Sequence, residues 1–81
     1  VLLPEWDVFP NPAIDYIQIM KPDPNLWKME MYNLNGQKQL ERTLWHEKEQ
    51  IQLELIPKGV YILRFISQQE DISMTHKIVL K

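Results

Sequence analysis

Residues 50–65, QIQLELIPKGVYILRF, decide the fold of this chain. In the first half, Ile51, Leu53 and Leu55 alternate with polar residues, which is the period of a strand with one buried face. After Pro57-Lys58-Gly59, the second half is apolar on both faces and carries a single charge, Arg64. A strand of that kind is typical of the middle of a sheet. The stretch therefore predicts two strands around this turn, with Tyr61, Leu63 and Phe65 sharing one face of the second.

The same period recurs on the N-terminal side and predicts further strands. Ile17 and Ile19 share one face within residues 15–20, and Trp27, Met29 and Met31 share one face within residues 27–31. Between them, Lys21-Pro22-Asp23-Pro24-Asn25 is a strong turn sequence. These segments predict two half-buried strands whose alternating residues belong to the core.

Residues 37–44 fit either a helix or a strand. Their helix propensity is good, and Leu40 and Leu44 are four residues apart, but these leucines also share one face of a strand. The preceding Asn35-Gly36 is the dipeptide favoured in type I′ hairpin turns, in which both residues have positive φ. That turn favours a return strand. Residues 45–49 then read as a polar connection in which Trp45 caps the core.

The two ends of the chain complete the pattern. Val8 and Phe9 predict an edge strand, which Pro10-Asn11-Pro12 interrupts by a bulge or a switch between sheets. Residues 67–71 predict a turn, and residues 72–80 predict a final strand with Met74, His76, Ile78 and Leu80 on one side. About seven short strands at regular spacing predict an all-β, immunoglobulin-like antiparallel sandwich. Tyr61 is then either a tyrosine corner or an ordinary core tyrosine.

Length and composition indicate one small domain. The chain has 81 residues, no cysteine and a formal charge of −2, so we expect neither disulfides nor a thiolate metal site. No basic stripe indicates a nucleic-acid partner, and no apolar run is long enough for a transmembrane segment. The first residue is valine, so we expect a piece of a longer protein in which residues 1–7 are the remnant of a linker.

Four motifs, in this order and spacing, resemble the type A C-terminal sorting domain of the type IX (Por) secretion system of Bacteroidetes. They are Val8-Phe9-Pro10-Asn11-Pro12-Ala13 with Asp15 after it, Tyr32-Asn33-Leu34-Asn35-Gly36-Gln37, the run LIPKGVYILR at residues 55–64, and Lys77-Ile78-Val79-Leu80-Lys81. The resemblance covers residues 8–81. Residues 53–57 depart from the Asp-Leu-Ser-type run of the family, and Leu80 stands where a second lysine is frequent.

The resemblance implies a sorting signal and not a catalyst. The domain would direct an N-terminal cargo of the same precursor through the periplasm and the type IX translocon to the cell surface or the medium. A sortase-like surface peptidase would then remove it by cutting before Val8. The resemblance assigns a sorting role to the motif residues Phe9, Pro10, Asn11, Pro12, Asp15, Tyr32, Asn33, Gly36, Gly59, Tyr61, Lys77, Ile78, Val79 and Lys81.

The residue inventory predicts no enzyme, cofactor or metal site. His46 and His76 lie on different elements without a serine or aspartate partner identifiable nearby in sequence, and two glycines do not make a phosphate-binding loop. A rival function is an immunoglobulin-like adhesion or carbohydrate-binding module, for which Trp6, Trp27 and Trp45 would offer a stacking platform. The simpler reading places Trp27 in the core with the other two tryptophans over its edges.

Overall fold

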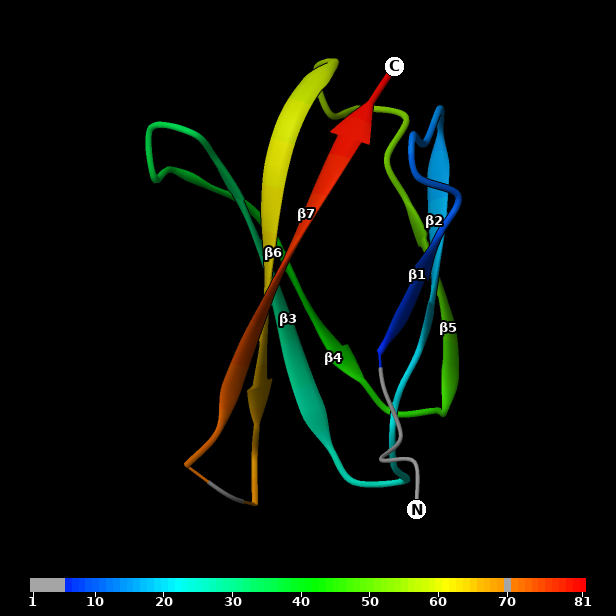
Figure 1. Ribbon diagram of the computed structural model, residues 1–81, viewed down its shortest axis with the longest axis vertical. Helices are drawn as coiled ribbons and strands as arrows, with labels where there is room; N and C mark the ends of the chain where they lie inside the picture. The colour runs from blue at the N-terminus through cyan, green and yellow to red at the C-terminus, as the bar shows by residue number, and fades with distance from the viewer. Residues whose placement is uncertain (1–5, 70) are drawn as a thin grey trace.

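The computed structural model describes residues 6–69 and 71–81. Within this part the chain forms seven strands and no helix (Figure 1). The strands are β1 (Asp7–Phe9), β2 (Tyr16–Met20), β3 (Trp27–Asn33), β4 (Lys38–Leu44), β5 (Lys48–Gln52), β6 (Gly59–Ser67) and β7 (Ser73–Leu80). The number and type of elements confirm the predicted all-β fold.

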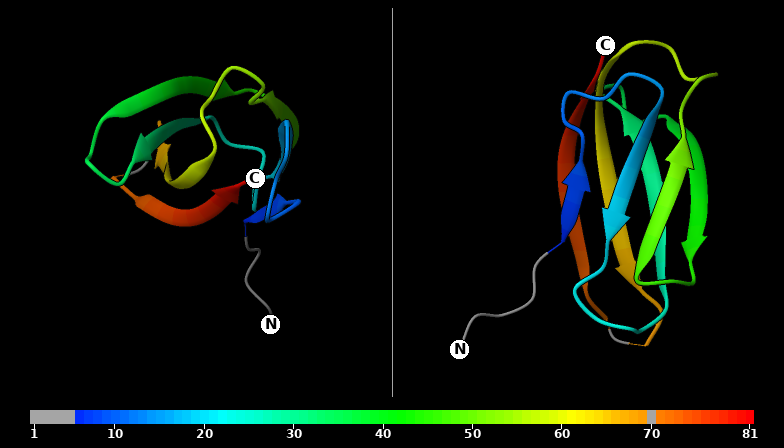
Figure 2. Two further views of the ribbon diagram at one scale, coloured as in Figure 1. Left: turned by 90° about the horizontal axis from the view of Figure 1, so that it is seen from above. Right: turned by 90° about the vertical axis from the view of Figure 1, so that its right-hand side faces the viewer.

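The strands form two antiparallel sheets that face one another. One sheet has the order β1-β2-β5 and the other the order β4-β3-β6-β7. Figures 1 and 2 show the two sheets as separate layers, which confirms the β-sandwich. This is an immunoglobulin-like arrangement in which a fourth strand extends the second sheet. Strand β6 lies between β3 and β7, as its two apolar faces predicted, whereas β5 lies in the opposite sheet. The Pro57-Lys58-Gly59 turn therefore connects the two layers.

The core fills the space between the sheets with the alternating residues of each strand. All the predicted core positions of β2, β3 and β6 are buried. The residues of this cluster are Val8, Ala13, Ile17, Ile19, Trp27, Met29, Met31, Leu44, Ile51, Leu53, Tyr61, Leu63, Phe65, Ile78 and Leu80. The alternation of apolar residues thus predicted most of the core correctly.

Leu55 is an exception, and the prediction that it belongs to the core is wrong. Strand β5 occupies Lys48–Gln52, earlier than predicted, and the chain leaves the sheet after it. The amide of Leu53 donates to the Asp15 carbonyl at 2.7 Å, and a turn follows in which the Ile56 amide donates to the Leu53 carbonyl at 3.0 Å. Because the strand has ended, the period of two ends with it, and Leu55 is 96% exposed.

Trp45 also lies outside the core, so the prediction that it caps the core is wrong. Leu44, the last residue of β4, points inward and is fully buried, while Trp45 is 68% exposed. Trp6, the residue before β1, covers the edge of the core instead. The Trp6 ring stacks on Phe65 with centroids 4.0 Å apart and meets Trp27 edge-on at 4.9 Å. Trp27 is buried, as predicted. Strand β1 begins at Asp7, and residues 1–5 of the predicted linker lie outside the described residues.

Strands β3 and β4 form the hairpin that Asn35-Gly36 predicted, but the turn is not type I′. Gly36 has a φ of 82°, whereas Asn35 does not have a positive φ. The Gly36 amide donates to the Asn33 carbonyl, and the side-chain oxygen of Asn33 accepts the amides of Asn35 and Gln37 at 3.0 and 2.9 Å. These bonds support a longer loop with glycine alone in the left-handed region, and the register shifts beside it, between Met31 and Tyr32.

The proline-rich connection between β2 and β3 is held by a buried lysine. Lys21 donates from Nζ to the carbonyls of Asn25 and Leu44 at 2.7 and 3.0 Å. The carboxylate of Asp23 accepts the Trp27 indole N–H at 2.9 Å. The turn predicted at residues 21–25 therefore joins the two sheets at one end of the sandwich through hydrogen bonds from its own polar side chains.

Candidate recognition surface

The Pro10-Asn11-Pro12 segment carries the chain from one sheet to the other. Strand β1 pairs with β2, but Ala13 forms an isolated parallel bridge with Leu80 in the other sheet. The Ala13 amide donates to the Val79 carbonyl at 2.8 Å, and the Lys81 amide donates to the Ala13 carbonyl at 2.7 Å. The switch between sheets that the sequence predicted is confirmed, and both X-Pro peptide bonds are cis.

The side chain of Asn11 extends this pairing by one more step along β7. Its Nδ2 donates to the Lys77 carbonyl at 3.2 Å, and its Oδ1 accepts the Val79 amide at 3.0 Å. An asparagine amide offers the same donor and acceptor as a peptide group, so Asn11 behaves like an additional residue of a neighbouring strand. Together, Asn11 and Ala13 occupy the outer edge of β7 between Lys77 and Lys81.

This pairing limits what the edge of the final strand can bind. The free edge of a terminal strand can pair with the backbone of a receptor. At the C-terminal end of β7 the outward backbone groups already bond to residues 11 and 13. A partner that recognises this end of β7 therefore has to bind its side chains.

The connection between β5 and β6 lies at the same end of the sandwich. Lys58 donates from Nζ to the Ile14 carbonyl at 2.7 Å, and the Leu53 amide bonds to Asp15. Figures 1 and 2 show the C-terminus beside the blue β1–β2 connection at this end. Residues from three distant parts of the sequence thus meet at one pole.

Tyr61 stabilises the same end of the sandwich from the core. Its ring is buried, and its hydroxyl donates to the Pro57 carbonyl four residues upstream. Of the two readings of Tyr61 from sequence, the tyrosine corner is the one that the structure shows. Gly59, between the two partners, has a φ of 153°, a conformation that residues with a Cβ rarely adopt.

The register of the four-stranded sheet places the second motif, residues 32–37, at this end as well. Asn33 pairs with Tyr61, and Tyr61 pairs with Ile78, so the end of β3, the start of β6 and the end of β7 form one row. All four sequence motifs therefore contribute to one end of the molecule, although Gly36 lies beyond the row in the β3–β4 turn.

Within the terminal strand, alternate residues have different surroundings. Ile78 and Leu80 point into the core and are buried. Lys77 and Lys81 are exposed and Val79 is half-buried. Of the other motif residues, Pro10, Asn11, Pro12 and Asp15 are exposed, while Phe9 and Tyr32 are half-buried. Ile78 and Tyr61 thus support the fold, and within residues 77–81 a partner can reach Lys77, Val79 and Lys81.

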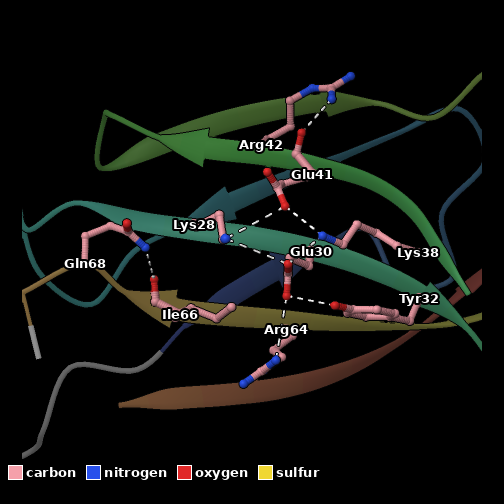
Figure 3. A network of polar contacts seen from close by, with 9 residues as sticks. All are labelled: Lys28, Glu30, Tyr32, Lys38, Glu41, Arg42, Arg64, Ile66 and Gln68. Atoms are coloured by element: carbon pink, nitrogen blue, oxygen red, sulfur yellow. Dashed lines mark hydrogen bonds and ion pairs between the residues drawn. The ribbon is translucent and has the colours of Figure 1, made fainter. Parts of the chain in front are cut away.

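Sequence reasoning missed a charge network on the outer face of β3. Glu30 is only 5% exposed and accepts a hydrogen bond from the Tyr32 hydroxyl at 2.9 Å. Its carboxylate lies 2.8 Å from Lys38, 3.8 Å from Arg64 and 3.9 Å from Lys28. Figure 3 shows Glu30 in the middle of these partners, with Glu41 binding the same two lysines from β4.

The network favours the charged forms of Glu30 and Lys38. The hydrogen bond from Lys38 is the main cause that lowers the pKa of Glu30 below its usual 4.5; burial opposes this, and Tyr32 and Lys28 reinforce it. The hydrogen bonds to Glu30 and then Glu41 raise the pKa of Lys38 above its usual 10.5. The alternation with Met29 and Met31 placed Glu30 on the outer face, but its cross-strand partners depend on a register that the sequence does not specify.

The described residues contain no group of three or more His, Cys, Asp or Glu side chains arranged to hold a metal ion. A groove does occur between β4 and the chain after β5, on a part of the surface to which no predicted sorting residue contributes. Its lining residues are Gln39, Leu40, Arg42, Gln52, Glu54, Leu55 and Ile56. The predicted sorting residues therefore do not line this groove.

The three tryptophans do not form the platform that a carbohydrate-binding module would need. Trp27 is buried, Trp6 stacks on the core residue Phe65, and Trp45 is exposed after β4. An aromatic platform needs ring faces open to solvent, and only Trp45 meets that condition among these three. The geometry of the tryptophans gives this rival function no support.

Comparison with known proteins identifies the type of domain. A family model described as a secretion system C-terminal sorting domain matches residues 7–81. No curated protein matches the chain significantly. In addition, the described part of the chain contains no helix with the length and apolar character needed to cross a membrane.

Proposed function

Because the chain belongs to the family of secretion system C-terminal sorting domains, we propose that its export signal is read from the exposed side chains of the terminal strand β7. Domains of this family are the C-terminal sorting signal for type IX secretion, so the domain implies a cargo precursor that is exported to the cell surface or secreted. The proposal concerns which residues carry that signal.

The pairing of Asn11 and Ala13 with β7 supports this proposal most directly. Four hydrogen bonds between these segments fix the backbone from Lys77 to Lys81. A fixed strand presents Lys77, Val79 and Lys81 in one orientation, and a partner then does not have to order them itself. The N-terminal motif thereby acts as a support for the C-terminal one.

The remaining steps of export are part of the same proposal. The precursor crosses the periplasm, the translocon receives the folded sorting domain, and a sortase-like peptidase cuts before Val8. Strand β1 runs toward the end that holds the C-terminus (Figure 1), so its first residue, Asp7, faces away from that end, and a peptidase at the start of β1 does not compete with a partner on residues 77–81. The domain itself takes no catalytic role.

A reporter protein fused ahead of residues 1–81 tests the proposal in a cell with a type IX system. Deleting residues 77–81 is a poor test, because it also removes Ile78 and Leu80 from the core. The sharper variant is Asn11→Ala, which removes two of the four hydrogen bonds along the edge of β7 and changes no core residue. Asn35→Ala is the matched control, since the Asn35 side chain makes no hydrogen bond among the described residues.

We expect Asn11→Ala to leave more reporter in the periplasm, while Asn35→Ala is exported like the parent. Equal export of the two variants would contradict the supporting role of Asn11. Mass spectrometry of the exported reporter locates the cut, which we expect before Val8. A cut on the C-terminal side of Val8 would contradict the proposed peptidase site without affecting the result for Asn11.

A further inference from the structure

The outer face of the four-stranded sheet has a charge opposite to that of the whole chain. The outward positions of β3, β4, β6 and β7 carry four cations and two carboxylates, a net charge of +2. They are Lys28, Lys38, Arg64 and Lys77, with Glu30 and Glu41. The full sequence has a charge of −2, so the rest of the molecule carries −4. We call these outward positions the basic face.

The cations of the basic face are unevenly compensated. Glu30 and Glu41 both bind Lys28 and Lys38, and Arg64 lies 3.8 Å from Glu30. Lys77, on the outermost strand, is exposed and has no ion pair among the described residues. The uncompensated positive charge therefore lies on the β7 side, next to the strand that carries the terminal motif.

An apolar strip lies across the same face. Tyr32 pairs with Lys38 on one side and with Ile62 on the other, and Ile62 pairs with Lys77. The adjacent row joins Val60 to Val79. Tyr32, Ile62, Val60 and Val79 are all half-buried. A tyrosine and aliphatic centre between lysines has the composition of a protein interface, in which apolar anchors are surrounded by charge.

We propose that the basic face binds an acidic surface of a protein of the export apparatus, with aliphatic side chains of that partner on the Tyr32–Val79 strip and a carboxylate at Lys77. This inference rests on the proposed function and names the chemistry of its partner. Because the face is positive in an otherwise acidic molecule, an acidic partner is attracted to this side and repelled from the others.

The spacing of the lysines favours a protein over a lipid phosphate. Lys38 and Lys77 stand in one row three strand spacings apart, which is about 14 Å. One phosphate group does not reach both, and the strip between them offers apolar contact instead of phosphate ligands. Carboxylates spaced along a protein surface match this pattern better than a single headgroup does.

Charge reversal in the reporter fusion tests the proposal. We expect Lys77→Glu to lower the exported fraction on the order of tenfold, because it replaces attraction by repulsion, and Lys77→Arg to restore it. Lys48→Glu is the matched control, since Lys48 is an exposed lysine on the other sheet. If the unmodified fusion is not exported, the proposed function fails. If it is exported and Lys77→Glu is exported equally well, only the basic face fails as a binding surface.

The folding of each variant is checked on the purified chain of residues 1–81. Lys77 is exposed, so we expect Lys77→Glu and Lys48→Glu to keep the parent's circular dichroism spectrum and urea midpoint. If a variant is exported less than the parent while its stability is unchanged, the loss of export is a loss of recognition. A variant that fails to fold is replaced by Lys77→Gln, for which the proposal requires a smaller loss of export than complete charge reversal.

The class of partner is tested by a photoreactive benzophenone amino acid placed in the fusion at Thr75, beside Lys77 on the basic face, or at Gln50 on the other sheet. Both residues are exposed. We expect a crosslink from Thr75, and none from Gln50, to a membrane or periplasmic protein at a peptide rich in Asp and Glu. Crosslinks from Thr75 to lipid alone, to a basic peptide, or equally from both positions would overturn the proposal.

Discussion

Tyr61 shows how one side chain links the core to a turn. Its ring is part of the sheet core, while its hydroxyl holds the Pro57 carbonyl at the point where the chain crosses between layers. Replacement by phenylalanine keeps the ring and removes the donor. Tyr61→Phe should therefore lower the free energy of unfolding by about 1–3 kcal/mol, measured from the urea midpoint. An unchanged midpoint would show that the ring alone stabilises the fold.

Glu30 makes the stability of the domain depend on pH. Its pKa in the folded state lies below the usual 4.5, so its ionised form stabilises the fold. That contribution is complete above the pKa of the unfolded state and is lost as the pH falls through the folded-state pKa. Glu30→Gln has no such titration and leaves Lys28, Lys38 and Arg64 without their buried partner.

The glutamine variant should accordingly be less stable than the parent at neutral pH, with a difference that shrinks as the pH falls below about 4.5. Urea unfolding at a series of pH values measures this difference. A constant difference between the two proteins from neutral to acid pH would mean that the Glu30 network does not contribute through its charge.

At the level of single elements, β5 and β6 show where the alternation of apolar residues is reliable. Leu63 and Leu55 each share a predicted strand face with two other apolar residues, but Leu63 is fully buried in a central strand and Leu55 is exposed after β5 has ended. Leu63→Ala should cost about 2–5 kcal/mol of unfolding free energy. Leu55→Ala, the matched leucine truncation, should stay within about 0.5 kcal/mol of the parent. Equal effects in urea unfolding would contradict the end of β5 at Gln52.

The link between the N-terminal segment and β7 is testable in the same way. Asn11→Ala removes the acceptor of the Val79 amide, whereas the Lys81 amide keeps its bond to Ala13. Hydrogen exchange should therefore become faster at the Val79 amide and change less at the amides of β6. Unchanged protection of Val79 would mean that Asn11 does not hold the strand edge in solution.

The elements also show what a sequence can and cannot predict. Alternation identified β2, β3 and β6 and their buried faces, because each strand has one side against the core. It did not predict the end of β5, since the turn closed by the Ile56–Leu53 hydrogen bond takes Leu55 out of the sheet. Asn35-Gly36 predicted a hairpin correctly and the turn type wrongly, because the Asn33 side chain supports a different loop.

In the molecule as a whole, motifs that are far apart in the sequence lie close together in space. The sequence could show four motifs, but not that residues 11 and 13 pair with residues 77–81, or that Asn33, Tyr61 and Ile78 share a row. These contacts depend on sheet order and register. The Glu30 network was missed for the same reason, because its charges come from three strands.

The two lateral edges of the sandwich differ in consequence. On one side, the switch at residues 10–13 closes the gap between β1 and β7. On the other side, a groove remains between β4 and the chain after β5. The motif residues gather at the closed side and along one pole, which is where a rigid recognition surface is expected in a domain whose task is to be recognised.

The most direct test of this account is the location of a reporter protein fused ahead of residues 1–81, measured as the fraction accessible at the surface or in the medium. Two otherwise identical strains are compared, one with a working type IX translocon and one without it. The account predicts export in the first strain and retention in the periplasm in the second. Retention in both strains, or equal export from both, would contradict the conclusion that this domain is a type IX sorting signal.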